Sequence, residues 1–175
     1  MSSLVTGCCV VSWIGSVLSR SVMDVPTEEI ELLSAFEQTI FPEGYLTKEA
    51  LCEQLRKPGA GYFLKRDTQG TPLGYALFVD DDGIRDVLRL GVQEQHRDRG
   101  IGSHILCAVT HDAFFPASSP RCRSTLLSVE KDNLRARVFY IRHNFVPIGH
   151  TDTHYLLELK NDRYPWNKYY DALRG

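Results

Sequence analysis

Apolar residues recur along the chain with two periods, and each period indicates one type of secondary structure. Ile101, Ile105 and Val109 form one stripe of helical period, which predicts a helix that begins near Ile101 and ends before Pro116. Further helices are predicted to begin at Pro26–Thr27 and at Thr47, and a fourth covers 134–143. Short apolar runs bounded by turn residues predict strands at 61–65, 74–79, 84–92, 124–129, 145–150 and 154–159.

This order of elements indicates one mixed α/β domain. With 175 residues, of which 43% are hydrophobic, the chain is long enough for one well-packed core and short for two. We expect the domain to cover 21–160. Residues 1–20 are interpreted as a leader or a first strand, and the aromatic tail 161–175 as packed on the domain or lying at an interface.

The charged turn between the predicted strand 84–92 and the helix that follows is suited to binding an anion. Gly100 and Gly102 lack a Cβ, so the backbone can approach a ligand closely while N–H groups face outward at the positive end of the helix. The turn lacks the third glycine of a dinucleotide fingerprint and the Gly-Lys-Ser/Thr of a P-loop. A pyrophosphate site is therefore predicted, the alternative being a turn whose glycines serve only packing.

Two motifs together resemble those of the GCN5-related N-acetyltransferase (GNAT) superfamily. The run from Arg97 to Gly102, Arg-Asp-Arg-Gly-Ile-Gly, is similar to the acyl-CoA loop of that family. Downstream, the family's Asn, Ala, Tyr and Phe stand in register at Asn133, Ala136, Tyr140 and Phe145, with Asn144 replacing the usual glycine. The resemblance covers about residues 84–150. It implies the GNAT fold: a mixed central sheet of about six to seven strands, splayed at the acyl-CoA wedge and flanked by about four helices.

The same resemblance implies acetyl-CoA as co-substrate. Backbone groups near Leu90 and Val92 would bind the pantetheine arm and the thioester carbonyl. The turn would hold the pyrophosphate, and Asn133 would lie near the cofactor arm. The implied cofactor-binding residues are Leu90, Val92, Arg97, Arg99, Gly100, Ile101, Gly102, Ser103 and Asn133. The alternatives are that the two arginines are merely solvated and that Asn133 only caps its helix.

The catalytic residues follow in part from the resemblance and in part from strand alternation. By resemblance, Tyr140 points its hydroxyl at the CoA sulfur and can donate a proton to the leaving thiolate, unless its ring only packs in the core. Ser128 stands where related enzymes carry a base and cannot serve as one. Alternation places Asp86 on one strand face with Leu88 and Leu90, which makes Asp86 the candidate base or amine-binding carboxylate, the alternative being a solvated aspartate. Glu130, His150 and His154 are the remaining candidates for the general base.

The stretch Phe41-Pro-Glu-Gly-Tyr45 is similar to a Phe-Pro-x-x-Tyr segment of protein N-terminal acetyltransferases. The resemblance implies that Phe41, Pro42 and Tyr45 line the acceptor groove. We therefore expect acetyl transfer by direct attack of a primary amine, at a protein N-terminus or a lysine. A small amine or polyamine acceptor is the alternative that Glu43 and the acidic run 80–82 favour if they face the groove. A non-catalytic acyl-CoA sensor is the alternative that Ser128 favours.

Composition narrows the classes of partner, the cellular compartment and the ligands that we expect for this chain. A net charge of −2 does not suit a sequence-independent nucleic-acid binder. Five cysteines without paired spacing indicate free thiols in a reducing compartment, hence the cytoplasm, and no metal is expected. The apolar run 5–18 is too short to span a bilayer, although lipidation at Cys8 or Cys9 stays open. We expect a monomer or a homodimer.

Overall fold

The computed structural model describes residues 16–19, 25–110 and 122–160, which form one seven-stranded mixed sheet with helices on both faces. The strand order is β1-β2-β3-β4-β5-β7-β6. The strands are β1 (Ser16–Ser19), β2 (Ala60–Arg66), β3 (Pro72–Asp81), β4 (Ile84–Val92), β5 (Ser124–Glu130), β6 (Val146–His150) and β7 (His154–Lys160). Among these seven strands, only β4 and β5 pair in parallel, and α3 lies between them in the chain. The predicted mixed sheet is confirmed.

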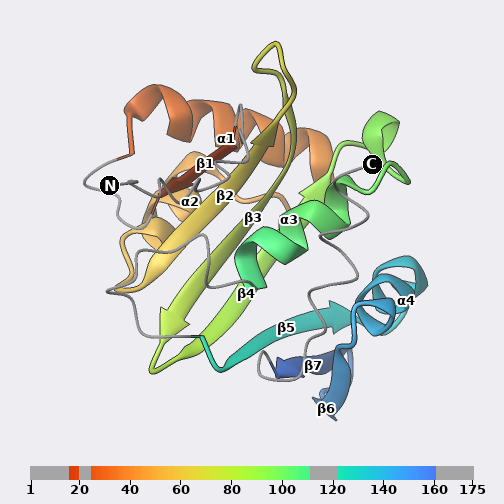
Figure 1. Cartoon of the computed structure of the whole chain (residues 1–175). Helices are drawn as coiled ribbons and strands as arrows, with labels where there is room; N and C mark the ends of the chain where they lie inside the picture. The colour runs from red at the N-terminus through yellow and green to blue at the C-terminus, as the bar shows by residue number, and fades with distance from the viewer. Residues whose placement is uncertain (1–15, 20–24, 111–121, 161–175) are drawn as a thin grey trace, which may run out of the picture.

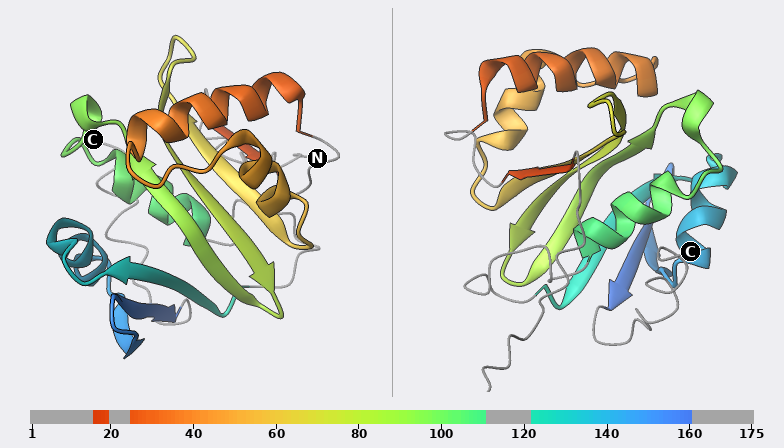
Figure 2. Two further views of the ribbon diagram at one scale, coloured as in Figure 1. Left: turned by 180° about the vertical axis from the view of Figure 1, so that it is seen from behind. Right: turned by 45° about the horizontal axis from the view of Figure 1, so that its top comes forward.

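Helices α1 (Thr27–Ile40) and α2 (Lys48–Leu55) cover one face of the sheet, and α3 (Ile101–Thr110) and α4 (Leu134–Arg142) cover the other (Figure 2). A short 3-10 turn, η2 (Glu94–His96), precedes α3. The predicted caps are confirmed: Thr47 Oγ1 accepts a hydrogen bond from Ala50 N at 3.2 Å, and Asn133 Oδ1 accepts one from Ala136 N at 3.0 Å. Beyond α4, Asn144 takes a left-handed conformation with φ 63°, which asparagine tolerates better than most residues.

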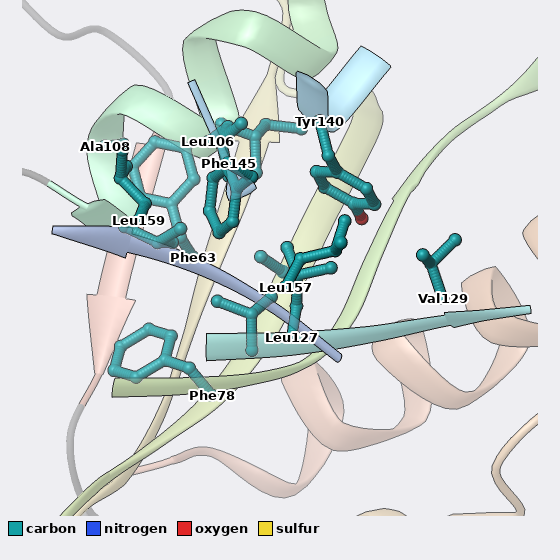
Figure 3. Packing of buried hydrophobic residues seen from close by; sticks show 14 of the residues in the cluster. Phe63, Phe78, Leu106, Ala108, Leu127, Val129, Tyr140, Phe145, Leu157 and Leu159 are labelled. Carbon is teal, nitrogen blue, oxygen red and sulfur yellow. The ribbon is translucent and has the colours of Figure 1, made fainter. Parts of the chain in front are cut away.

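Two buried clusters, one on each face of the sheet, form the core. The first joins α3, α4 and the strands β2 to β5 and β7, and part of it is drawn in Figure 3. The second joins α1 and α2 to the opposite face of β2, β3 and β4. Ile30, Leu33 and Phe36 of α1 are buried in it, as the helical period predicts. The sheet therefore lies between the pair α1 and α2 and the pair α3 and α4.

Of the N-terminal residues 1–20, the structure describes only β1, in which Ser16 pairs with Lys65 and Ser19 with Tyr62 of β2. Residues 1–15, with Cys8 and Cys9, lie outside the described residues, as do the connector at 111–121 and the aromatic tail 161–175. The proposed boundaries at 20 and 160 therefore stay predictions.

Candidate active site

The site is built where β4 and β5 separate. Their parallel pairing runs only from Ile84↔Ser124 to Val87↔Leu127, although β4 continues to Val92 and β5 to Glu130. Figure 1 shows the two strands side by side at their first residues and apart at their ends. The separation opens a wedge in the middle of the sheet.

A β-bulge in β4 coincides with this separation. Leu77 of β3 faces Arg89 and Phe78 faces Val87, so Leu88 is an additional residue in β4. A bulge bends its strand and increases the local twist, which turns the rest of β4 away from β5. The wedge therefore follows from a single extra residue.

The backbone of the last part of β4 faces the wedge at alternate residues. The amide of Gln93 donates to Leu73 O of β3 at 3.0 Å, so Gly91 and Gln93 direct their peptide groups toward β3. Leu90 and Val92, one residue out of phase, direct theirs toward the open side, where β5 no longer pairs. This placement is consistent with the predicted backbone roles of Leu90 and Val92.

The turn before α3 presents unpaired amides. Asp98 has φ 61° and Gly100 has φ 76°, both left-handed, and α3 begins directly afterwards at Ile101. Within the described part of the chain, no acceptor pairs with the amides of Ile101, Gly102 or Ser103, which are the first N–H groups of the helix. A Cβ added to Gly100 would meet no atom within 4 Å. The space and the donors suit a phosphate group.

The two arginines predicted to assist this turn differ in their contacts. Arg97 Nε donates to Val92 O at 3.1 Å, so this side chain also fixes the end of β4 and occupies the carbonyl of Val92. Arg99 is exposed and makes no hydrogen bond or ion pair with the described residues. Between them, Asp98 accepts hydrogen bonds from Arg135 of α4 at 2.9 and 3.0 Å. Arg97 thus has a structural role that the sequence does not indicate, and Arg99 remains accessible for an anion.

A histidine that the sequence analysis missed supports the same turn. His143 is buried, its Nδ1 lies 2.8 Å from Phe139 O, and its Nε2 lies 2.9 Å from Ser103 Oγ. Because a carbonyl only accepts, Nδ1 carries the hydrogen and Nε2 accepts from the Ser103 hydroxyl. Burial lowers the pKa of His143, which favours this neutral form. The contact joins the end of α4 to the first turn of α3. Because the two residues are 40 positions apart, no local sequence pattern indicated that they meet.

Tyr140 lies in the buried cluster on the α3 and α4 side of the sheet, together with Val129 and Leu157. Its ring makes an edge contact with Phe139, with centroids 5.2 Å apart, and a tilted contact with Phe145 at 5.6 Å. Figure 3 shows the hydroxyl at the end of the ring that points away from α4 and toward the strands. Burial raises the pKa of Tyr140 to about 12, so the hydroxyl stays protonated at neutral pH.

Asp86 and Ser128 lie on the other face of the sheet, which is the face that α1 and α2 cover in part. Both side chains are exposed, and Asp86 of β4 is in register with Leu126, two residues before Ser128 on β5. Desolvation by the neighbouring protein nevertheless raises the pKa of the Asp86 carboxyl.

The expectation that Asp86, Leu88 and Leu90 share one face is wrong for Leu90. Leu88 packs against the cluster of α1 and α2, whereas Leu90 packs against the cluster of α3 and α4. The bulge at Leu88 shifts the alternation by one residue, so counting by twos fails beyond it. Asp86 is therefore placed on the face opposite Leu90.

The segment Phe41–Tyr45 connects α1 to α2 on the same face as Asp86. Phe41 is half-buried against the second cluster, and Pro42 and Tyr45 are exposed. Gly91 of β4 passes directly beneath this segment, since a Cβ at Gly91 would lie 2.8 Å from Phe41 Cζ. Phe41, one of the three residues predicted to line the acceptor groove, thus lies over the end of β4.

Two further findings concern classes of ligand and location. Within residues 25–110 and 122–160, no group of three or more His, Cys, Asp or Glu side chains is arranged to hold a metal ion. In the same part of the chain, no helix is both long and apolar enough to cross a membrane.

Comparison with known proteins gives a family match and similar folds. The profile of the Acetyltransferase (GNAT) family matches residues 28–145. A mycothiol acetyltransferase of Stackebrandtia nassauensis is 34% identical over 90 residues, which is 51% of this chain and only 28% of that protein. The chain therefore corresponds to less than a third of the length of this relative.

Two solved structures show the same fold. The PaiA N-acetyltransferase of Thermoplasma acidophilum, solved with coenzyme A, superposes with a TM-score of 0.66 at 14% identity, covering 83% of this chain and 98% of that one. The ribosomal-protein-S18-alanine N-acetyltransferase of Escherichia coli gives the same TM-score and identity, covering 83% of this chain and 93% of that one.

Proposed function

The chain belongs to the GNAT family of acetyltransferases, and we propose that it acetylates a primary amine at a protein N-terminus or a lysine. As an acetyl-CoA-dependent acetyltransferase it needs a site for the thioester and a site for the acceptor. The observation that carries the proposal is the wedge after Val87 and Leu127, with the α3 turn and Tyr140 on one face and Asp86 on the other. A thioester in the wedge would be open to attack from the second face.

The chemistry that this arrangement supports is direct transfer. The amide of Leu90 or Val92 would donate to the thioester oxygen and stabilise the charge that develops there. A neutral amine would form the new N–C bond as the C–S bond breaks, and Tyr140 would give its proton to the departing thiolate. Asp86, with its raised pKa, would accept the proton that the amine loses, directly or through water. The amides of Ile101, Gly102 and Ser103, with Arg97, Arg99 and Asn133 nearby, would hold the rest of the acyl-CoA.

The contacts of the acidic run favour a peptide over a polyamine. Asp80 accepts two hydrogen bonds from the fully buried Arg85, at 2.6 and 2.7 Å. Asp82 lies in the tight turn between β3 and β4 and pairs with Arg123 at 3.5 Å. Two of the three carboxylates are therefore already paired with arginines of this chain, which weakens the case that they recruit a polycation.

Location and assembly belong to the same proposal. Cys52, Cys107 and Cys122 are free thiols, in keeping with a reducing compartment, and we propose the cytoplasm. A monomer or a homodimer would suffice for the chemistry above, because all the proposed groups come from one chain.

The proposed function is tested by incubating the full chain with acetyl-CoA and three acceptor sets while free thiol is measured. The sets are tetrapeptides with each of the twenty N-terminal residues, a lysine-containing peptide with a blocked N-terminus, and spermidine. Thiol release with a peptide set supports the proposal. Release with spermidine alone would assign a polyamine acceptor instead, and tight CoA binding without any release would indicate a sensor.

A further inference from the structure

A buried carboxylate lies under the segment Phe41–Leu46, which is proposed to line the acceptor groove. It has no role in the chemistry described so far. Glu37 lies in the last turns of α1 and its side chain is fully buried. Burial raises the pKa of this carboxyl, against the opposing effects of Leu46 and Arg89. Leaving a carboxylate in such a place is costly unless it is hydrogen-bonded and paired. Its contacts should therefore explain why it is there.

The Glu37 side chain joins α1 to the end of the segment Phe41–Leu46 and to β4. Its Oε2 accepts a hydrogen bond from the amide of Leu46 at 2.6 Å. Its Oε1 has no hydrogen-bond partner among the described residues, but lies 3.8 Å from Nε of Arg89. One carboxylate thus contacts the last residue of the segment and a guanidinium on β4.

Arg89 completes the connection from the strand side. Its Nη2 donates to Gly44 O at 2.7 Å, and its guanidinium carbon lies 5.1 Å from the ring centroid of Phe41. The planar guanidinium can make these contacts together because its donors are fixed in one plane while its face packs on the ring. We call Glu37 and Arg89 the clamp, since together they hold Phe41, Gly44 and Leu46 against β4.

The bulge that opens the wedge also directs Arg89 toward the clamp. In a regular strand, Arg89 would point to the same face as Val87, which belongs to the cluster under α3. The extra residue Leu88 reverses this, so Arg89 faces α1. The next residue along, Leu90, has the backbone proposed to bind the thioester. The position of the acceptor segment is thereby linked to the strand that holds the reacting carbon.

We propose that Glu37 and Arg89 are positioning residues that fix the Phe41–Leu46 segment over β4 and thereby set acceptor affinity. This proposal rests on the proposed function, since it assumes that the segment lines the acceptor groove. It adds that acceptor binding, and not acetyl-CoA binding, depends on this buried pair.

Two variants test the clamp while retaining most of its shape. Glu37→Gln keeps an acceptor oxygen for the Leu46 amide but removes the charge that faces Arg89. Arg89→Lys keeps the positive charge but loses the planar donors. The matched control is Glu31→Gln, which removes a carboxylate from the same helix; among the described residues, Glu31 pairs with the exposed Lys48.

Steady-state kinetics with the best tetrapeptide and acetyl-CoA separate the two substrates. We expect each clamp variant to raise the KM for the peptide about tenfold or more, because a misplaced positioning segment costs rate and affinity steeply. The KM for acetyl-CoA should change by less than about twofold in the clamp variants. In the control Glu31→Gln, the KM values for peptide and for acetyl-CoA should both change by less than about twofold. An equal rise in both KM values, or a change only in thermal stability, would overturn the proposal.

Amide hydrogen exchange gives a readout that needs no acceptor. If the clamp holds the segment, the Leu46 amide should exchange faster in Glu37→Gln than in the wild type, because the neutral amide oxygen is a weaker acceptor than the carboxylate, while β5 amides keep their rate. Unchanged exchange at Leu46 would overturn the clamp even in an active enzyme. A wild type that shows the expected exchange but acetylates no amine would instead overturn the proposed function, and with it the acceptor role.

Discussion

Replacing Tyr140 with phenylalanine separates a role in proton transfer from a role in packing. The ring contacts with Phe139 and Phe145 are retained in Tyr140→Phe, and the hydroxyl makes no hydrogen bond within the described residues. A typical hydrogen bond contributes about 1 kcal/mol to stability, so the free energy of unfolding should change by less than about that amount. The fold and the affinity for CoA should therefore persist.

The expected loss in rate is much larger than the expected loss in stability. General-acid catalysis contributes about 10² to 10⁴ in rate, which corresponds to roughly 2.7 to 5.4 kcal/mol in the barrier. Because the pKa of Tyr140 is about 12, fewer than about one in 10⁴ hydroxyls ionise below pH 8, and the loss should be the same from pH 6 to 8.

The assay is single-turnover acetyl transfer, followed by thiol release, because slow product release would otherwise hide the chemical step. Tyr155→Phe is the matched control: Tyr155 lies on β7, its ring contacts Lys131 and Arg137, and we assign its hydroxyl no chemistry. A single-turnover rate within twofold of the wild type would refute proton donation by Tyr140. Equal losses in the variant and the control would assign both effects to packing.

Three further predictions concern the carboxylate, the anion turn and a buried histidine. Asp86→Asn should slow transfer at neutral pH and recover in part as pH rises and more neutral amine forms, whereas wild-type rates at every pH would leave Asp86 without a role. CoA at about 100 times its dissociation constant should stabilise the fold by roughly 2.7 kcal/mol in thermal melts, and Gly100→Glu should abolish the shift through bulk and charge at the α3 turn. His104 is largely buried in α3 and its pKa is lowered to about 4 by desolvation, so the unfolded chain takes up its proton first as pH falls. Stability should be complete above pH 6.5 and about 2 kcal/mol lower at pH 5, as measured by urea unfolding, and His104→Gln should remove this loss whereas the exposed His150→Gln should not.

The sequence by itself determined the features that depend on neighbouring residues. Helix starts at Thr47 and Asn133, the left-handed Asn144 and the glycine turn before α3 are all set within four residues, so local spacing was sufficient to predict them. The two linked motifs around Arg97 and Tyr140 also indicated the family, because a ligand that spans several elements requires residues at fixed positions in each.

The tertiary structure alone decided which side chains meet across the sheet. The bulge at Leu88 depends on how β3 and β5 pair with β4, and one inserted residue was enough to separate Leu90 from Asp86 and to turn Arg89 toward α1. Glu37 is the clearest case: its place in α1 indicated only another helical turn, but packing buries it against residues nine and 52 positions away. Contacts of this kind follow from the free energy of burying and pairing charges in three dimensions, which no local pattern of residues records.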